Sequence, residues 1–157
     1  MITNLNNKDA TLTLKAAGIS KTSQRLAVLN ILLAATMPLS ASTIRQTLKT
    51  KASIDKVTVY RILSLFKQNG IIREISSANG ANYFEMATLD NPRHPHFSCR
   101  SCGTLTCLAP LPISEDPESI LSGNDYSIDH VEINISGLCA CCRKSAKPQK
   151  TFCKQEK

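Results

Sequence analysis

The chain has 157 residues, only 4% of them aromatic and none of them Trp, which argues against one large aromatic core and favours two compact halves. The net charge of +7 lies in the first half: residues 1–85 carry eleven Lys and Arg against four Asp and Glu, whereas residues 86–157 carry eight of each sign. A basic half indicates a polyanionic partner, most simply nucleic acid, although charge alone is also typical of a solvated surface.

The uncharged stretch 26–44 is interrupted by Asn30, Pro38, Ser40 and Ser42, so it predicts two short helices rather than a membrane span. The chain start lacks the basic and apolar segments of a signal peptide. Seven cysteines, an odd number, argue against a fully paired secreted disulfide scaffold. We therefore expect a cytoplasmic protein that does not associate with membranes.

Three amphipathic helices are predicted in the first half, after a weaker helical pattern over residues 4–17. Thr22 can cap the first and Ser40 can start the second, while the third begins near Asp55 and ends at Gly70. Apolar residues spaced three and four apart predict one buried face on each helix. These residues are Leu26, Leu29 and Leu33 in the first helix, Ile44 and Leu48 in the second, and Val59, Ile62, Leu63 and Phe66 in the third.

Two strand-like segments, residues 71–76 and 81–86, follow the helices and are separated by a turn ending in Asn-Gly. Three helices followed by a hairpin is the element order of a winged helix-turn-helix. We therefore predict a winged-helix DNA-binding domain over residues 1–86. Residues 87–95 are rich in breakers and polar groups and are interpreted as a hinge.

A second domain is predicted over residues 96–142, followed by a basic tail, residues 143–157, that we expect to be disordered. Within this domain, residues 103–109 and 126–137 have strand composition, and a short helix is predicted over residues 114–121. The predicted fold class is therefore α+β.

Two C-x-x-C pairs, Cys99 with Cys102 and Cys139 with Cys142, are the strongest chemical signal in the sequence. Together they can form a closed tetrahedral zinc site with a structural role, because four thiolates leave no open position for chemistry. The alternative is a set of buried thiols without metal, or a disulfide. Zinc-enzyme motifs such as H-E-x-x-H are missing from the sequence. We therefore expect neither enzyme activity nor a small-molecule substrate.

Two glycines flank these pairs, and two further cysteines are left unassigned. Gly103 follows the first pair and Gly137 precedes the second, as tight turns around a metal require. Cys141 and Cys153 receive no predicted ligand role.

His94 and His96 alternate in an extended segment, so both imidazoles can point to the same side and bind one further metal ion. A metal at the hinge would change the angle between the two domains and so act as a switch. Its other ligands must come from elsewhere in the chain. The nearest suitable donors are Glu85, Glu74 and Cys107, with Asp90 and His130 as weaker candidates.

The third helix can read DNA, because its apolar stripe leaves other side chains facing outward. Arg61 can read guanine in a major groove and Tyr60 can meet a thymine methyl or a phosphate, although an ordinary solvated face is the alternative. The predicted DNA-binding residues are Thr58, Tyr60, Arg61, Ser64, Arg25, Lys21 and Lys15.

Five segments, in this order and spacing, resemble the ferric uptake regulator superfamily of bacterial metal-sensing repressors: "TSQRLAVLNIL", "LSAS", "VTVYRILSLFKQNGII", "CRSCG" and "SGLCACC". The resemblance spans roughly residues 10 to 142. It implies a winged-helix domain, a hinge, an α/β dimerisation domain, a four-cysteine structural zinc site and a regulatory metal site at the hinge. It also implies a homodimer that binds a palindromic double-stranded DNA operator when metal is bound and represses transcription.

Within this superfamily the chain is most similar to the zinc uptake regulators, which share the "GLC-x-x-C" ending and a histidine at the position of His130. Iron-type members usually have a histidine where this chain has Pro38 and Leu39, and commonly have Glu where it has Cys107. A thiolate ligand favours Zn²⁺ over Fe²⁺ or Mn²⁺. We therefore expect a zinc-responsive repressor of metal uptake genes. The alternatives are an iron- or peroxide-responsive repressor of the same superfamily, or a zinc-ribbon adaptor that senses no metal.

Overall fold

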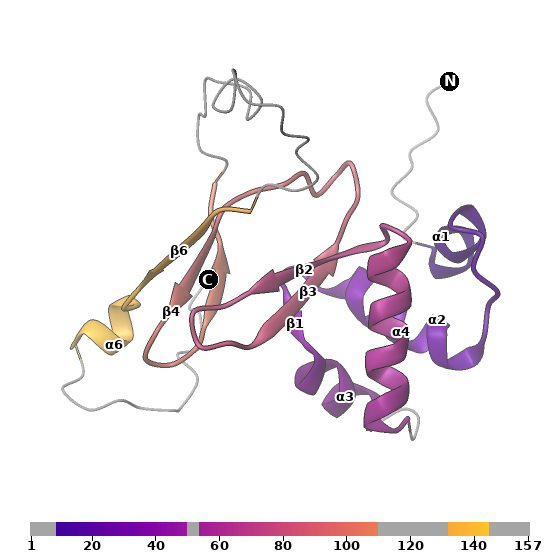
Figure 1. Cartoon of the computed structure of the whole chain (residues 1–157), viewed down its shortest axis with the longest axis horizontal. Coiled ribbons are helices and arrows are strands. Elements are labelled where there is room, and N and C mark those ends of the chain that lie inside the picture. The colour runs from indigo at the N-terminus through magenta and orange to yellow at the C-terminus, as the bar shows by residue number, and fades with distance from the viewer. Residues whose placement is uncertain (1–8, 50–53, 110–131, 145–157) are drawn as a thin grey trace, which may run out of the picture. The chain divides into compact units, whose positions relative to one another are not determined.

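The computed structural model describes residues 9–49, 54–109 and 132–144, and it divides the chain into two compact units (Figure 1). The first unit holds Gly80–Pro92 together with the described residues up to Ser76. The second holds Ser77–Asn79 and the described residues from Arg93 onward. Both units contain helices and strands, so the predicted α+β class is confirmed.

Polar caps start the helices of the first unit where the sequence predicts them. The Thr22 hydroxyl accepts from the Arg25 N–H at 3.3 Å, and the Ser40 hydroxyl accepts from the Thr43 N–H at 3.1 Å. Asp9 caps the preceding helix, whose predicted start over residues 4–8 lies outside the described residues. The helices in the described part of this unit are α1 (Ala10–Ala16), α2 (Ser23–Ala34), α3 (Ala41–Lys49) and α4 (Lys56–Gln68).

The apolar stripes of these helices form one core, as their spacing predicts. Phe66, Leu29 and Ile44 are fully buried, whereas Leu26 is only half-buried and packs at the edge of the core. Leu14 of α1 is also fully buried, so the weak helical pattern at the chain start is part of the same core. Among the described residues, no helix is both long and apolar enough to cross a bilayer.

A three-stranded antiparallel sheet completes the first unit and makes it a winged helix-turn-helix. Its strands are β1 (Leu39–Ser40), β2 (Ile72–Ser76) and β3 (Asn82–Met86), in the order β1-β3-β2. The hairpin β2–β3 was predicted, but β1 was not, because two residues are too short to show an alternating pattern. Gly80 has a φ of +77°, which explains the glycine in the predicted turn.

Residues 87–92, the larger part of the predicted hinge, are bonded to the first unit. Arg73 donates from its guanidinium to the Asn91 carbonyl at 2.5 Å, and the Asn91 side-chain amide donates to the Met86 carbonyl at 2.8 Å. The Ala87 N–H donates to the Ile71 carbonyl at 2.9 Å. Within the predicted hinge, the boundary between the two units falls between Pro92 and Arg93.

The second unit contains a sheet in the order β5-β4-β6, with strands β4 (His96–Cys99), β5 (Leu105–Cys107) and β6 (Asn134–Gly137). Strand β5 is antiparallel to β4, and β6 is parallel to it. The segments predicted as strands contain β5 and β6. The helix predicted over residues 114–121 and the first part of the strand predicted over residues 126–137 lie outside the described residues.

A short helix, α6 (Ala140–Lys144), was not predicted. It contains Arg143 and Lys144, so the prediction that a disordered tail begins at Arg143 is wrong for these two residues. The remainder of the predicted tail lies outside the described residues.

Candidate metal centres and nucleic-acid interface

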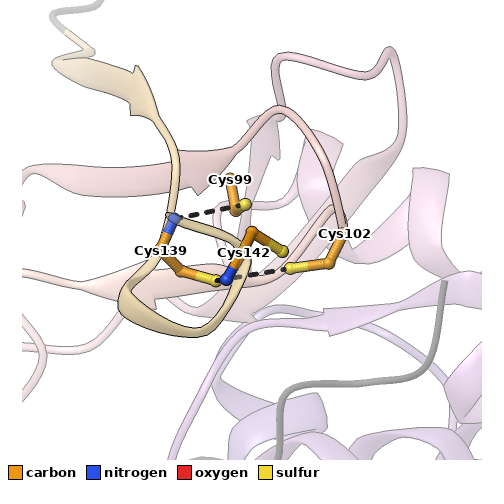
Figure 2. A group of neighbouring side chains, drawn as sticks. All are labelled: Cys99, Cys102, Cys139 and Cys142. Atoms are coloured by element: carbon orange, nitrogen blue, oxygen red, sulfur yellow. Dashed lines mark hydrogen bonds between the residues drawn. The ribbon is translucent and has the colours of Figure 1, made fainter. Parts of the chain in front are cut away.

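The parallel pairing of β4 with β6 brings the two C-x-x-C pairs together. Cys99 ends β4 and lies opposite Gly137, which ends β6, so the turns after both strands leave the same end of the sheet. The first turn carries Cys102, and the second carries Cys139 and leads into α6 with Cys142. Figure 2 shows the four side chains pointing toward one another.

The geometry of this four-cysteine cluster fits zinc. The four sulfurs lie within 4.8 Å of one another, and the Cys102 and Cys139 sulfurs are 3.8 Å apart. Tetrahedral coordination with zinc–sulfur bonds of about 2.3 Å separates two sulfurs by about 3.8 Å. The Cys139 N–H points at the Cys99 sulfur at 3.4 Å, and the Cys142 N–H points at the Cys139 sulfur at 3.5 Å. These donors would stabilise thiolates and orient them for a metal.

Two thiols of the cluster have widely separated pKa values when no metal is bound. Burial raises the pKa of Cys99, but backbone N–H groups of Cys102, Cys139 and Ser101 outweigh it and lower the pKa to about 6. For Cys142, a hydrogen bond with Ser101 lowers the pKa, but burial and the neighbouring cysteine sulfurs raise it to about 12. Backbone N–H groups of the turns therefore stabilise the Cys99 thiolate, whereas the Cys142 thiol keeps its proton until a cation replaces it.

These pKa values predict how zinc affinity depends on pH. Because the Cys142 thiol is protonated below pH 12, zinc must displace at least one proton, so affinity should fall at least about tenfold per pH unit on acidification. Below about pH 6 Cys99 is protonated as well, and the fall should steepen by about another tenfold per unit. Chelator competition between pH 8 and pH 5 measures this slope. A constant affinity over that range would contradict thiolate coordination.

The two glycines beside the cysteine pairs have different roles. Gly103 has a φ of +75°, and its N–H donates to the Cys99 carbonyl at 2.8 Å, so it closes the first turn as predicted. Gly137 is not needed for a turn: a Cβ there would lie 3.2 Å from the Phe97 ring, so packing explains this glycine. Cys141 is exposed and outside the cluster, which agrees with its lack of a predicted role.

A second group of side chains that could bind a metal ion lies where β4 begins. His96 is the first residue of β4 and lies directly opposite Cys107, the last residue of β5. His94 precedes His96 by two residues, and the centroids of the two rings are 4.5 Å apart. Direct cross-strand partners and alternate residues share one face of a sheet. The ligand atoms of these three residues accordingly lie within 4.8 Å of one another.

The two predicted glutamate ligands belong to the first unit, on opposite faces of its sheet. Glu85 lies opposite Arg73, is buried and pairs with the Arg73 guanidinium at 2.9 Å. Glu74 lies opposite Phe84, pairs with Lys67 and accepts from the Asn82 amide at 2.6 Å. Because they lie on opposite faces, the two carboxylates cannot both bind one ion. Glu74 is in neither cluster of possible ligands found among the described residues, so of the two only Glu85 stays a candidate ligand.

The two weaker candidates do not extend this group. Asp90 is exposed in the turn after β3 and belongs to neither metal-binding cluster found among the described residues. His130 and Cys153 lie outside the described residues.

Three of the four side chains of α4 that were predicted to contact DNA lie on its outward face. Tyr60, Arg61 and Ser64 are exposed, as the helical spacing predicts. Thr58 is half-buried, and its hydroxyl donates to the Asp55 carboxylate and lowers the pKa of that carboxyl below its usual value. The Thr58 side chain therefore stabilises the start of α4. Val57, which was not among the predicted DNA-binding residues, is also exposed on this face.

The three basic residues predicted outside α4 differ in their contacts. Lys15 and Lys21 are exposed. Arg25 is half-buried, and its guanidinium donates to both the carbonyl and the hydroxyl of Ser20 at 2.6 Å. Arg25 thus holds the loop before α2, and its predicted contact with DNA stays a prediction.

The sequence and structure of this chain are similar to those of one family of known proteins. The sequence profile of the Ferric uptake regulator family matches residues 16–136. The peroxide operon regulator of Bacillus subtilis is 28% identical over 138 residues, which cover 87% of this chain and 93% of that protein.

Two solved structures share the fold. The ferric uptake regulator of Vibrio cholerae has a TM-score of 0.69 and 26% identity, with 83% of this chain and 100% of that chain covered. The ferric uptake regulator of Helicobacter pylori has a TM-score of 0.70 and 20% identity, with 87% and 91% covered. The predicted similarity to the zinc uptake regulators stays a prediction, because these relatives are named for peroxide and iron.

The profile match extends from the end of α1 to within β6 and so includes the winged helix, both histidines and the first cysteine pair. A family of transcriptional regulators agrees with the predicted absence of enzyme activity. The chain belongs to the ferric uptake regulator family.

Proposed function

We propose that this protein is a zinc-responsive transcriptional repressor that binds a palindromic DNA operator as a homodimer. The observation that carries the proposal is the cluster of His94, His96 and Cys107, which is separate from the four-cysteine cluster. The four-cysteine cluster would hold a structural zinc, and the His94–His96–Cys107 cluster would sense metal. A fold that needs only a structural metal has no use for a second, chemically different set of donors.

The donor set favours zinc as the sensed metal. Two imidazoles and a thiolate suit Zn²⁺, whereas Fe²⁺ and Mn²⁺ favour harder oxygen donors. A bound ion would supply a cross-link between the segment before β4 and strand β5. Glu85 stays the predicted ligand from the DNA-binding unit. Since the histidines follow the junction of the two units directly, their ordering by metal can bias how the units are held for DNA binding.

An iron- or peroxide-responsive repressor is the second candidate. It is favoured by the name of the B. subtilis relative, which is a peroxide operon regulator. The two candidates differ in which metal restores operator binding and in whether peroxide abolishes it.

The experiment begins with an operator selected from random double-stranded DNA by the zinc-loaded protein. Fluorescence anisotropy then measures affinity for this operator after mild chelation and after addition of Zn²⁺, Fe²⁺ or Mn²⁺. One zinc per chain should stay in the four-cysteine cluster after mild chelation. We expect Zn²⁺ added beyond this one equivalent to restore operator binding. Restoration by Fe²⁺ alone, with loss on peroxide treatment, would favour the second candidate. Equal binding in chelated and loaded states would instead indicate a zinc-ribbon adaptor that senses no metal.

Arg61→Ala should weaken binding to the selected operator by about 1–3 kcal/mol while leaving zinc content unchanged, because Arg61 is exposed on α4 and can read a guanine edge. Anisotropy titrations on operator and on random DNA measure the difference. Arg100→Ala, which removes an exposed charge of the same kind from the second unit, is the control and should change operator binding little. An equal loss on random DNA would mean that Arg61 contacts only phosphate.

A further inference from the structure

The exposed face of α4 begins with an apolar side chain. Val57 is 57% exposed and Tyr60 is 49% exposed. Residues 57, 60, 61 and 64 are spaced three and four apart and so share one face of the helix, away from the buried stripe. A single exposed valine is ordinary on a protein surface. This one lies on the face that presents Tyr60 and Arg61, which the proposed function assigns to DNA.

The neighbours of Val57 in the first turn of α4 have other contacts. The Thr58 hydroxyl is bonded to Asp55, and the Lys56 ammonium lies 5.8 Å from the centroid of the Tyr60 ring. Val57 is therefore the residue of this turn that presents an apolar surface to solvent. Because valine is a weaker helix former than alanine, its presence there is not explained by helix stability.

The position of Val57 suits contact with a base. The N-terminal residues of a recognition helix are the ones that reach base edges in the major groove. The apolar group that a base presents in that groove is the C5-methyl of thymine. A branched aliphatic side chain can bury this methyl, but it can neither donate to nor accept from any other base edge.

We propose that Val57 is a specificity-determining residue that recognises a thymine in the operator through its C5-methyl group. This inference rests on the proposed DNA-binding function and deepens it. It assigns to the first turn of α4 an apolar contact that is separate from the polar contact of Arg61. Burial of one methyl-sized group corresponds to about a fourfold change in affinity.

The test is a cycle that removes the methyl group from the DNA and the aliphatic side chain from the protein. Each thymine of the selected operator is replaced in turn by uracil, which lacks only the C5-methyl, in both halves of the site. Wild-type protein and Val57→Ala are titrated on each DNA. We expect one replacement to weaken the wild type about fourfold per half-site and to leave Val57→Ala unaffected.

A matched control is Gln68→Ala, which lies on the same face at the far end of α4 and should keep the wild-type response to every uracil. Since Val57 is exposed, its replacement by alanine should not disturb folding, and circular dichroism and zinc content check this. The proposal is overturned if no uracil weakens the wild type, or if Val57→Ala still responds at the same thymine. A wild-type protein that selects no sequence from random DNA would instead overturn the proposed DNA-reading function itself.

Discussion

Replacing Cys99 by serine should release the tightly held zinc and unfold the second unit. Cys99 is fully buried, ends the central strand of its sheet and holds together two turns that depend on the same four sulfurs. Loss of one thiolate from a closed site forfeits much of roughly 10 kcal/mol of metal-coupled folding free energy. Metal content by mass spectrometry, thermal melting and the oligomeric state measure the effect. Cys142→Ser should behave in the same way.

Cys141→Ser is the matched control for these variants. Cys141 lies in the same helix as Cys142 but is exposed and outside the cluster, so its replacement should leave zinc content and melting temperature unchanged. If the Cys99→Ser and Cys142→Ser proteins remain dimeric and retain their zinc, these two cysteines are not ligands of the structural site.

His96→Ala should leave a folded dimer that keeps the structural zinc but no longer tightens on its operator when zinc is added. A metal shifts a conformational equilibrium only by its differential affinity for the two states, and removing the His96 imidazole removes much of that difference. A coupling free energy of about 2 kcal/mol corresponds to a change of some thirtyfold in operator affinity. Anisotropy titrations with and without added zinc measure this factor. His94→Ala should lose the response as well.

Two further variants separate sensing from structure. Cys107→Ser should weaken the zinc response in the same direction, because Cys107 lies directly opposite His96. Thr106→Ser is its control, since Thr106 precedes Cys107 on β5 and therefore points to the other face of the sheet. If both histidine variants respond to zinc like the parent protein, the sensing site would have to be sought around His130.

The sequence by itself determined the features that depend on neighbours along the chain. Caps at Thr22 and Asp55 and the apolar spacing in α4 predict helices at their observed positions, because capping and helical periodicity act within a few residues. The two C-x-x-C pairs predict one closed site, because a thiolate cluster of this size needs both pairs. Helix caps and apolar periodicity therefore account for the predicted helices of the winged helix, and the two C-x-x-C pairs account for the four-cysteine cluster.

Only the tertiary structure decided which distant side chains share a site. His96 is joined to Cys107 by the antiparallel register of β4 with β5, and no local pattern encodes that register. The same kind of register places Glu74 and Glu85 on opposite faces of the first sheet, although both are suitable ligands by residue type. Strand β1 and helix α6 were missed for a related reason: elements this short are stabilised by their partners in the fold rather than by their own sequence.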